Sequence, residues 1–125
     1  MRLHTGIVII AHGSRSDEAN QDVMYIGKAL REQGYYKVVE VGYLELARPD
    51  VLTAIDTCVS KGANHVIVIP FFLLAGTHVQ EDLPALMEQA RAKHPDVIIQ
   101  MGRHLGFHQQ LVEIILDRIT DAKEG

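Results

Sequence analysis

The sequence has too little cysteine for a disulfide and no apolar run long enough for a membrane span. Its one cysteine, Cys58, falls inside a helical pattern, so we expect a reducing compartment and a structural role for this thiol. A membrane-spanning helix needs roughly 18 consecutive apolar residues, and no run here is that long. The segment Met1–Thr5 leads directly into an apolar run, which leaves no room for a signal peptide. We therefore expect a cytoplasmic protein with no membrane partner.

The chain also lacks an excess of basic residues. Lysine and arginine number 12 against 16 aspartates and glutamates, and the formal net charge is -4. Nucleic-acid binding normally requires a basic face, so nucleic acid is not an expected partner. No linker, repeat or low-complexity tract divides the 125 residues, of which 47% are hydrophobic. Such a chain can bury one core, and we expect a single domain over residues 1–125.

Four apolar runs of strand length alternate with four segments of helical periodicity. The predicted strands are Ile7–Ala11, Lys37–Leu44, His65–Ile69 and Val97–Met101. The predicted helices cover 17–33, 51–62, Pro84–Lys93 and Phe107–Thr120. Pro84 is taken as the start of the third helix because proline is favoured in a first turn. The fourth helix carries one apolar stripe, formed by Leu111, Ile114, Ile115 and Ile119.

This alternation predicts the fold class. Strands that alternate with helices form a parallel sheet with right-handed crossovers and helices on both faces. We expect a three-layer α/β/α arrangement of the flavodoxin-like type, with four strands in the order 2-1-3-4. Ligands of such sheets bind at the carboxyl ends of the strands, where the strand order reverses. His12 and His78 follow strands one and three, so the topology predicts one shared site at that point.

The loop after the first strand contains several candidate site residues. His12 can accept a proton or ligate a metal, Gly13 allows a tight turn, and Arg15 adds a positive charge. The backbone N–H groups of residues 14–17, including Ser14, open a helix and predict an anion site. The glycine spacing of a dinucleotide site and the Gly-Lys-Ser/Thr of a P-loop are both missing, so nucleotide binding is not expected. The alternative is an ordinary polar loop with an incidental histidine.

The segment after the third strand stays apolar where a loop is expected. Phe71–Leu74 either line a pocket for a flat apolar ligand or cap the core. Gly76 would let the backbone approach a ligand closely. If the following residues are helical, Asp82 stands one turn from His78 and can orient its imidazole. Asp82 as an ordinary helix cap is the alternative.

Other candidates lie on the same predicted sheet edge. Glu45, after the second strand, is a candidate general base or metal ligand, or else a solvated carboxylate. Arg48 either clamps a ligand carboxylate or points outward. His104 and His108 are four residues apart and either form a zinc-type pair or border the main cleft. The remaining histidines, at positions 4, 65 and 94, fall at the opposite edge or outside the sheet.

Three segments together carry a resemblance to a known family. They are Ala11-His12-Gly13-Ser14-Arg15, Glu45-x-x-x-Pro49, and Pro70-Phe71-Phe72-Leu73-Leu74-Ala75-Gly76-Thr77-His78 with Asp82-Leu83-Pro84. In this order and spacing they resemble the small class II tetrapyrrole chelatases of the CbiX/SirB group, over nearly the whole chain. The resemblance implies a chelatase-like fold and insertion of a divalent metal, Co²⁺, Fe²⁺ or Ni²⁺, into sirohydrochlorin. It implies no ATP and no other cofactor. The product would serve cobalamin, siroheme or a nickel cofactor.

The resemblance also implies roles for individual residues. His12 would be the proton acceptor and a metal ligand, and His78 the second ligand. The macrocycle site would be lined by Leu73, Leu74, Ala75, Gly76, Thr77 and His78, with position 48 in contact. Several small members carry an acidic residue before the proline, whereas this chain has Arg48. Short members pair as homodimers, and the length of this chain fits that form.

The residues suggest a mechanism for such a reaction. A free tetrapyrrole carries two protons on its inner nitrogens, and a neutral imidazole can accept them near neutral pH. We expect His12, helped by Glu45, to remove the protons, while Glu45 balances the charge of the metal. Arg15 and Arg48, with the helix amides, would hold peripheral carboxylates.

Two other classes of protein share these features. One is a non-catalytic metal or tetrapyrrole carrier that uses the same cleft. The other is a histidine phosphatase-like hydrolase, suggested by His12-Gly13 and Arg103-His104. In such enzymes an arginine precedes the nucleophilic histidine and a glycine follows it. Here Ala11 precedes His12 and Leu105 follows His104, so neither copy completes the pattern.

Overall fold

The computed structural model describes residues 2–74 and 76–125, and the side chain of His78 lies outside the described part. The strands are β1 Thr5–Ala11, β2 Val38–Tyr43, β3 His65–Pro70 and β4 Ile98–Met101. The helices are α1 Asp17–Glu32, α2 Val51–Ser60, α3 Thr77–Lys93 and α4 Gln109–Glu124. All neighbouring strands are parallel, in the order β2-β1-β3-β4. The predicted fold class and strand order are therefore confirmed.

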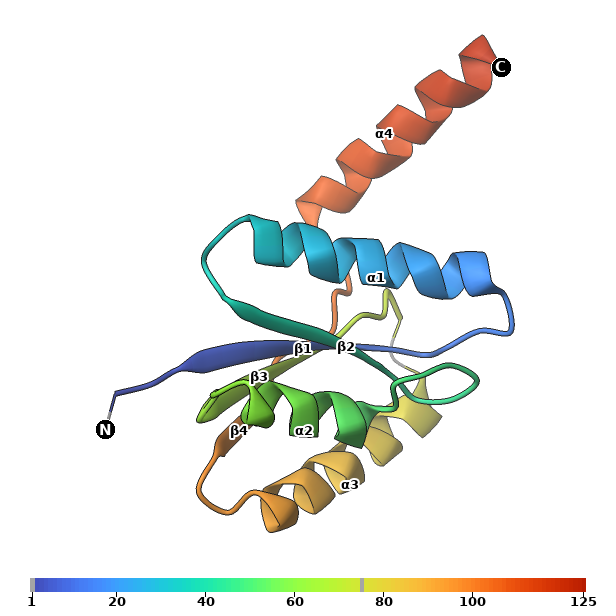
Figure 1. Cartoon of the computed structure of the whole chain (residues 1–125). Helices are drawn as coiled ribbons and strands as arrows, with labels where there is room; N and C mark the ends of the chain where they lie inside the picture. The colour runs from blue at the N-terminus through green and yellow to red at the C-terminus, as the bar shows by residue number, and fades with distance from the viewer. Residues whose placement is uncertain (1, 75) are drawn as a thin grey trace.

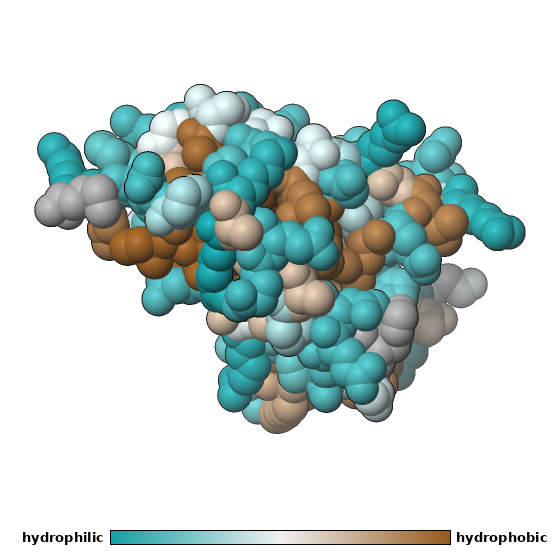
Figure 2. Space-filling view, turned by 90° about the horizontal axis from the view of Figure 1, so that it is seen from below, coloured by the Kyte–Doolittle hydropathy of each residue, from teal (hydrophilic) through white to brown (hydrophobic). Residues whose placement is uncertain are grey.

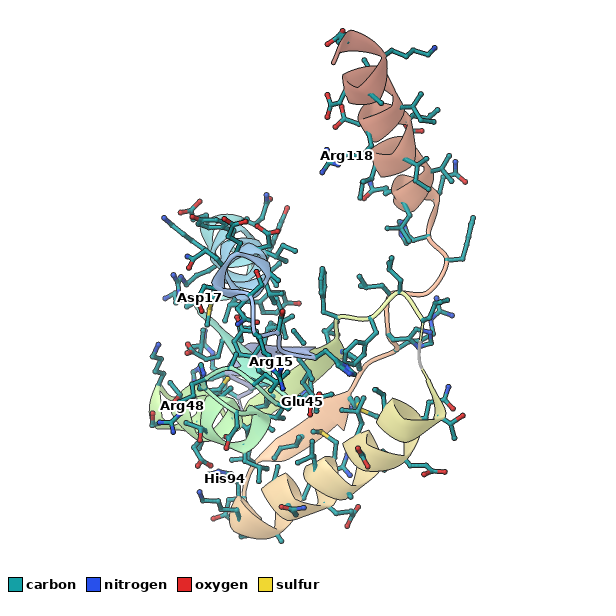
Figure 3. The ribbon with its side chains drawn as sticks, turned by 90° about the vertical axis from the view of Figure 1, so that its right-hand side faces the viewer. Arg15, Asp17, Glu45, Arg48, His94 and Arg118 are labelled. Carbon is teal, nitrogen blue, oxygen red and sulfur yellow. The ribbon has the colours of Figure 1, made fainter. Side chains whose placement is uncertain are left out.

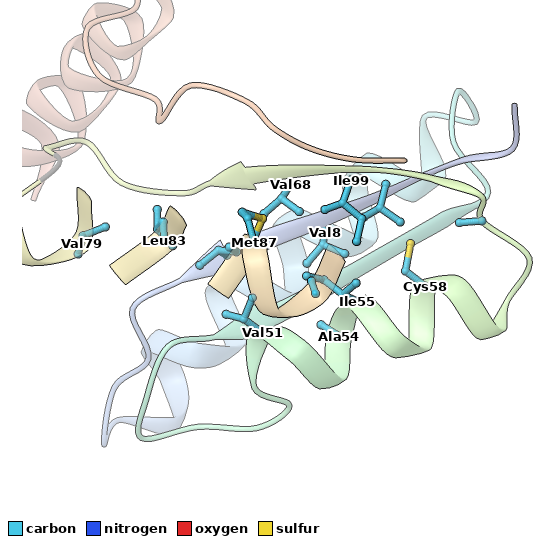
Figure 4. Packing of buried hydrophobic residues seen from close by; sticks show 14 residues of the cluster. Val8, Val51, Ala54, Ile55, Cys58, Val68, Val79, Leu83, Met87 and Ile99 are labelled. Carbon is cyan, nitrogen blue, oxygen red and sulfur yellow. The ribbon is translucent and has the colours of Figure 1, made fainter. Parts of the chain in front are cut away.

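Three layers are visible in Figure 1, with α1 on one face of the sheet and α2 and α3 on the other. The larger core lies between the sheet and the α2–α3 layer (Figure 4), where Val8, Ile55 and Val66 are fully buried. The surface of this layer is mostly polar, with apolar patches between the polar side chains (Figure 2). β1 is buried on both faces because helices cover it on both sides, as is usual for parallel sheets. The apolar run of β1 thus fixes its central place in the sheet.

Cys58 lies in this core, as expected for a structural thiol. Its side chain is fully buried in α2, and burial raises the pKa of the thiol to about 11. The sulfur fills the space beside Gly6, where an added Cβ would lie 2.3 Å from Sγ. The thiol is therefore neutral and enclosed, which suits packing and not metal binding or catalysis.

The third helix begins earlier than the sequence predicts. It starts at Thr77 and contains Pro84 in its interior, so the predicted start at Pro84 is wrong. The reason is packing: Val79, Leu83, Met87 and Ala90 form a buried stripe at helical spacing. Burial of Val79 and Leu83 extends the helix N-terminal to the proline and outweighs the loss of one backbone hydrogen bond. This extension places position 78 in a helix and not in a loop.

An ionic cluster ties α2 to the end of α3. Lys93 Nζ and His94 Nε2 lie 2.6 Å and 2.7 Å from the two carboxylate oxygens of Asp56. Partial burial raises the pKa of Asp56, but the hydrogen bonds and charges of Lys93 and His94 outweigh it and hold the pKa below its ordinary value of 3.8. The carboxylate is therefore stabilised in its charged form by the fold.

This cluster makes a small, pH-dependent contribution to stability. A lowered folded pKa stabilises the fold above the unfolded pKa, and this contribution is lost as pH falls through the folded value. We expect Asp56→Asn to lower the free energy of unfolding by up to about 1 kcal/mol near neutral pH, because the pair is partly exposed. In urea titrations the loss should shrink as the pH falls below the ordinary pKa of 3.8 and through the lower folded value. Asp96→Asn, at an exposed carboxylate, is the control; an Asp56→Asn effect that grows in acid would contradict the assignment.

Candidate functional site

The loops that follow β1 and β2 are held side by side at the carboxyl edge of the sheet. Leu44 N donates to Ala11 O at 2.9 Å, and Glu45 N donates to His12 O at 3.1 Å. These bonds continue the parallel ladder one step beyond the two strands. His12 and Glu45 are thereby fixed as neighbours, as their places after adjacent strands predict.

Gly13 allows this close approach. Its φ is +93°, in the left-handed region that glycine tolerates. A Cβ at this position would lie 1.7 Å from the carbonyl oxygen of Glu45. No side chain fits there unless the His12 and Glu45 loops separate. The contact between the two loops therefore depends on glycine at position 13.

Asn20 fixes the other end of the His12 loop. Ser14 N donates to Asn20 Oδ1 at 2.9 Å, and Asn20 Nδ2 donates to Ser14 O at 2.8 Å. The buried Tyr43 donates its hydroxyl to Asn20 O at 2.7 Å, which links this contact to β2. Asn20 was missed by sequence reasoning. An asparagine in the first turn of the helix after the loop was the available signal, because such side chains often bond nearby backbone groups.

Removal of the Asn20 side chain should loosen this loop. We expect Asn20→Ala to lower the free energy of unfolding by about 1–3 kcal/mol, because two hydrogen bonds to the Ser14 backbone are lost. Asn20→Asp keeps the acceptor for Ser14 N–H and should lose less. Urea unfolding measures both, and an Asn20→Ala protein as stable as the wild type would show that the reciprocal bonds contribute nothing.

Half of the N–H donors of the predicted anion site at the start of α1 bind groups of the protein itself. Ser14 N–H donates to Asn20, and Ser16 N–H donates to Ser14 Oγ at 3.0 Å. The first turn of α1 also carries Asp17 and Glu18, which repel an anion. Two of the four predicted N–H donors, those of Ser14 and Ser16, are thus engaged within the loop and are not available to an anion. The exposed guanidinium of Arg15 is the cationic group of this loop.

A pocket of about 340 Å³ opens between this sheet edge and α3. Its lining combines polar and apolar side chains: His12, Leu44, Glu45, Asp82, Ala85, Leu86 and Gln89. The ring of Phe72 meets the ring of His12 edge to face, with centroids 5.6 Å apart and planes at 86°. A histidine and two carboxylates thus line one pocket, and an aromatic ring packs against the histidine. This set can accept protons and ligate a cation.

The apolar segment after β3 divides into two parts. Phe71 and Phe72 are half-buried and pack against the cores on opposite faces of the sheet. Leu73 and Leu74 are instead 56% and 88% exposed. Capping of the core therefore accounts for the two phenylalanines only. The two leucines therefore form an exposed apolar surface on the loop after β3, as is expected of a ligand-binding loop.

Other predicted residues of this segment lie near the start of α3. Gly76 is the N-cap and Thr77 the first residue of the helix, and both are exposed. Ala75 and the side chain of His78 lie outside the described residues. Position 78 precedes Asp82 by one helical turn, so the two positions share a face of α3. Asp82 is not a helix cap, because it lies in the second turn.

The predicted arginines lie in different places. Figure 3 shows Arg15 and Glu45 on neighbouring loops and Arg48 farther toward α2. Arg48 borders a separate hollow with Pro49 and Asp50, and it does not line the His12 pocket. The structure thus brings Glu45 to His12 but leaves Arg48 outside that pocket.

The other histidines do not form a second site. His104 lines a hollow of about 250 Å³ with Phe72 and Arg103, whereas the His108 side chain caps α4 by accepting from Gln110 N. Of the opposite-edge histidines, His65 bonds Thr5 and His94 bonds Asp56. Among the described side chains, no three histidine, cysteine or carboxylate groups lie close enough together to hold one metal ion. Within the same residues, no helix is long and apolar enough to span a membrane.

Comparison with known proteins gives consistent matches. The family model described as CbiX matches residues 6–122. The sirohydrochlorin cobaltochelatase of Priestia megaterium is 37% identical over 95% of this chain and 39% of its own length. The chloroplastic sirohydrochlorin ferrochelatase of Arabidopsis thaliana is 37% identical over 91% of this chain and 51% of its own. The chain therefore spans about two fifths to one half of these relatives.

A solved structure extends the comparison to the fold. The cobalt complex of the sirohydrochlorin chelatase SirB from Bacillus subtilis subspecies spizizenii has a TM-score of 0.88 and 28% identity. The match covers 95% of this chain and 51% of that protein.

Proposed function

Because the chain belongs to the CbiX family, we propose that it catalyses insertion of a divalent metal ion into sirohydrochlorin. The observation that carries the proposal is the pocket that His12 and Glu45 line together, with the ring of Phe72 packed edge to face against His12. Relatives named as sirohydrochlorin cobaltochelatase and ferrochelatase support it, and so does a cobalt-bound structural neighbour. A flat macrocycle with ionisable nitrogens suits a pocket that combines proton-accepting side chains with apolar ones, such as Leu44 and Leu86.

The reaction requires removal of two protons from the ring nitrogens. Imidazole accepts protons near neutral pH, and we assign this step to His12, whose ring orientation is supported by the edge contact with Phe72. Glu45 lies on the adjoining loop and would balance the charge of the metal or take the proton onward. The hydrogen bond from Glu45 N to His12 O would keep the two groups together during the reaction.

The metal is a substrate that must be released, so a small ligand set is suitable. We propose that His12 and His78 hold the ion before transfer, with Asp82 as a neighbouring carboxylate on α3. Few protein ligands leave coordination positions open for the ring nitrogens. Imidazole binds Co²⁺, Fe²⁺ and Ni²⁺, so the donor type is compatible with all three.

The macrocycle would rest on the segment from Leu73 to His78. Exposure of Leu73 and Leu74 supports this role, because exposed leucines next to an aromatic ring offer an apolar platform. The Arg15 guanidinium and the Ser14 hydroxyl would hold peripheral carboxylates. Arg48 is the least supported contact, since it borders a different hollow. We propose no ATP and no further cofactor, and a homodimer that supplies the other wall of the cleft.

The test is metallation of sirohydrochlorin followed by absorbance, in parallel with Co²⁺, Fe²⁺ and Ni²⁺. We expect the protein to accelerate insertion of at least one of these ions above the rate in buffer. Rates equal to buffer with all three metals, for protein that binds sirohydrochlorin, would favour a carrier instead.

A further inference from the structure

A second hollow lies next to Phe72, the residue whose ring packs against His12. It has a volume of about 250 Å³, and Phe72 forms part of its wall. Pockets that enclose a whole drug-sized ligand usually have volumes of roughly 300–1,000 Å³, so this hollow suits a part of a ligand. A single aromatic side chain touches both His12 and this hollow. A ligand bound at His12 therefore has the hollow within reach.

The lining of this hollow combines apolar side chains with two basic ones. Its apolar lining residues come from α3 and from the ends of β3 and β4: Pro70, Phe72, Val79, Leu83 and Met101. The basic residues are Arg103 and His104, in the segment after β4. Within the described part of the chain, no carboxylate lines the hollow, and neither basic side chain has a hydrogen-bond or ion-pair partner. Such a lining suits a ligand arm that is apolar along its length and anionic at its end.

The two basic residues lie between two backbone anchors. Gly102 N donates to Val68 O at 2.8 Å, and Leu105 N donates to Phe72 O at 3.1 Å. At Gly102 an added Cβ would lie 2.7 Å from Cδ1 of Ile69, so the absence of a side chain lets the segment come this close to β3. Figure 1 shows the segment after β4 beside the loop that follows β3. The backbone on either side of the basic pair is thus fixed to β3 and its loop.

We propose that this hollow binds one peripheral side chain of the macrocycle, and that Arg103 and His104 hold its carboxylate. The inference rests on the proposed function, because it takes sirohydrochlorin as the substrate. The peripheral side chains of sirohydrochlorin are short alkyl chains that end in carboxylates. Their methylene groups match the apolar lining, the guanidinium pairs with the carboxylate in a bidentate manner, and an imidazole N–H donates a further hydrogen bond. An arm held there fixes how the ring lies over His12.

The contact is tested by the dissociation constant of sirohydrochlorin, measured without metal in a titration followed by absorbance. Arg103→Gln should raise this constant about tenfold, because a charge-assisted pair with the carboxylate is lost. Arg103→Lys keeps the charge but not the bidentate geometry, and it should recover part of the affinity. Arg31→Gln is the control, since it removes an exposed arginine from the last turn of α1. It should bind as the wild type does.

The methyl ester of sirohydrochlorin shows whether the contact is made with a carboxylate. Wild type and Arg103→Gln should bind the ester with equal affinity, because its side chains carry no charge. A loss of equal size with the acid and the ester would overturn the inference, and so would no loss with the acid.

The binding measurement separates this inference from the proposed reaction. Equal affinity of the wild type and Arg103→Gln for sirohydrochlorin, in a protein that inserts metal, would overturn the inference and leave the proposed function intact. Weaker binding by Arg103→Gln, in a protein that inserts no metal, would support the carboxylate contact and refute the reaction. A wild type that does not bind sirohydrochlorin would overturn both.

Discussion

Replacement of His12 by alanine should reduce the rate of metal insertion by roughly 10²–10⁴-fold, the usual contribution of a positioned proton acceptor. His12 is exposed in the pocket, its backbone carbonyl holds the Glu45 loop, and its ring meets Phe72. The substitution removes only the imidazole, so the loop and the thermal midpoint should be nearly unchanged. The measurement is the initial rate of metallation under substrate saturation.

Two variants make this result specific. His12→Gln keeps a polar side chain that cannot take a proton at neutral pH, and it should be as slow as His12→Ala. His4→Ala removes an exposed histidine at the opposite edge of the sheet and should keep the wild-type rate. Insertion by folded His12→Ala at close to the wild-type rate would refute the assignment of the proton acceptor.

The second large effect is expected for Gly13→Ala. An alanine here combines an unfavourable positive φ with a Cβ 1.7 Å from the Glu45 carbonyl oxygen. We expect a loss of about 2–4 kcal/mol in the free energy of unfolding. The rate of metal insertion should fall as well, because the His12 and Glu45 loops must separate. Chemical unfolding and the metallation rate measure the two effects.

Gly34→Ala is the matched control for this variant. Gly34 has a similar φ of +88°, but no atom lies within 4 Å of an added Cβ. It therefore reports the cost of backbone strain without the clash. A Gly13→Ala protein that loses no more stability than Gly34→Ala would show that the contact between the two loops is not tight.

The fold was predictable because its signals are strong and local. Four apolar runs mark strands that are buried by helices, and the handedness of the crossovers leaves few possible strand orders. The same reasoning predicted that Glu45 lies on the same sheet edge as His12, and the structure joins their loops by a hydrogen bond. It did not require any long-range packing information.

The errors come from interactions that local patterns do not show. Pro84 marked a helix start in the sequence, but burial of Val79 and Leu83 carries the helix past it. Two of the four free amides expected at the start of α1 are engaged by Asn20 and Ser14, contacts that only the folded loop reveals. The alternation of strands and helices predicts helices on both faces of the sheet, whereas α4 projects away from the sheet (Figure 1) and none of its described residues is buried.

The most direct test of the central claim is the yield of metallated sirohydrochlorin when substrate and metal exceed the protein manyfold. We predict repeated turnover: many equivalents of product per protomer, formed faster than in buffer, by a protein in which His12 is intact. A product yield that stops at one equivalent per protomer, or that forms at the buffer rate, would contradict the account and identify the pocket as a binding site without catalysis.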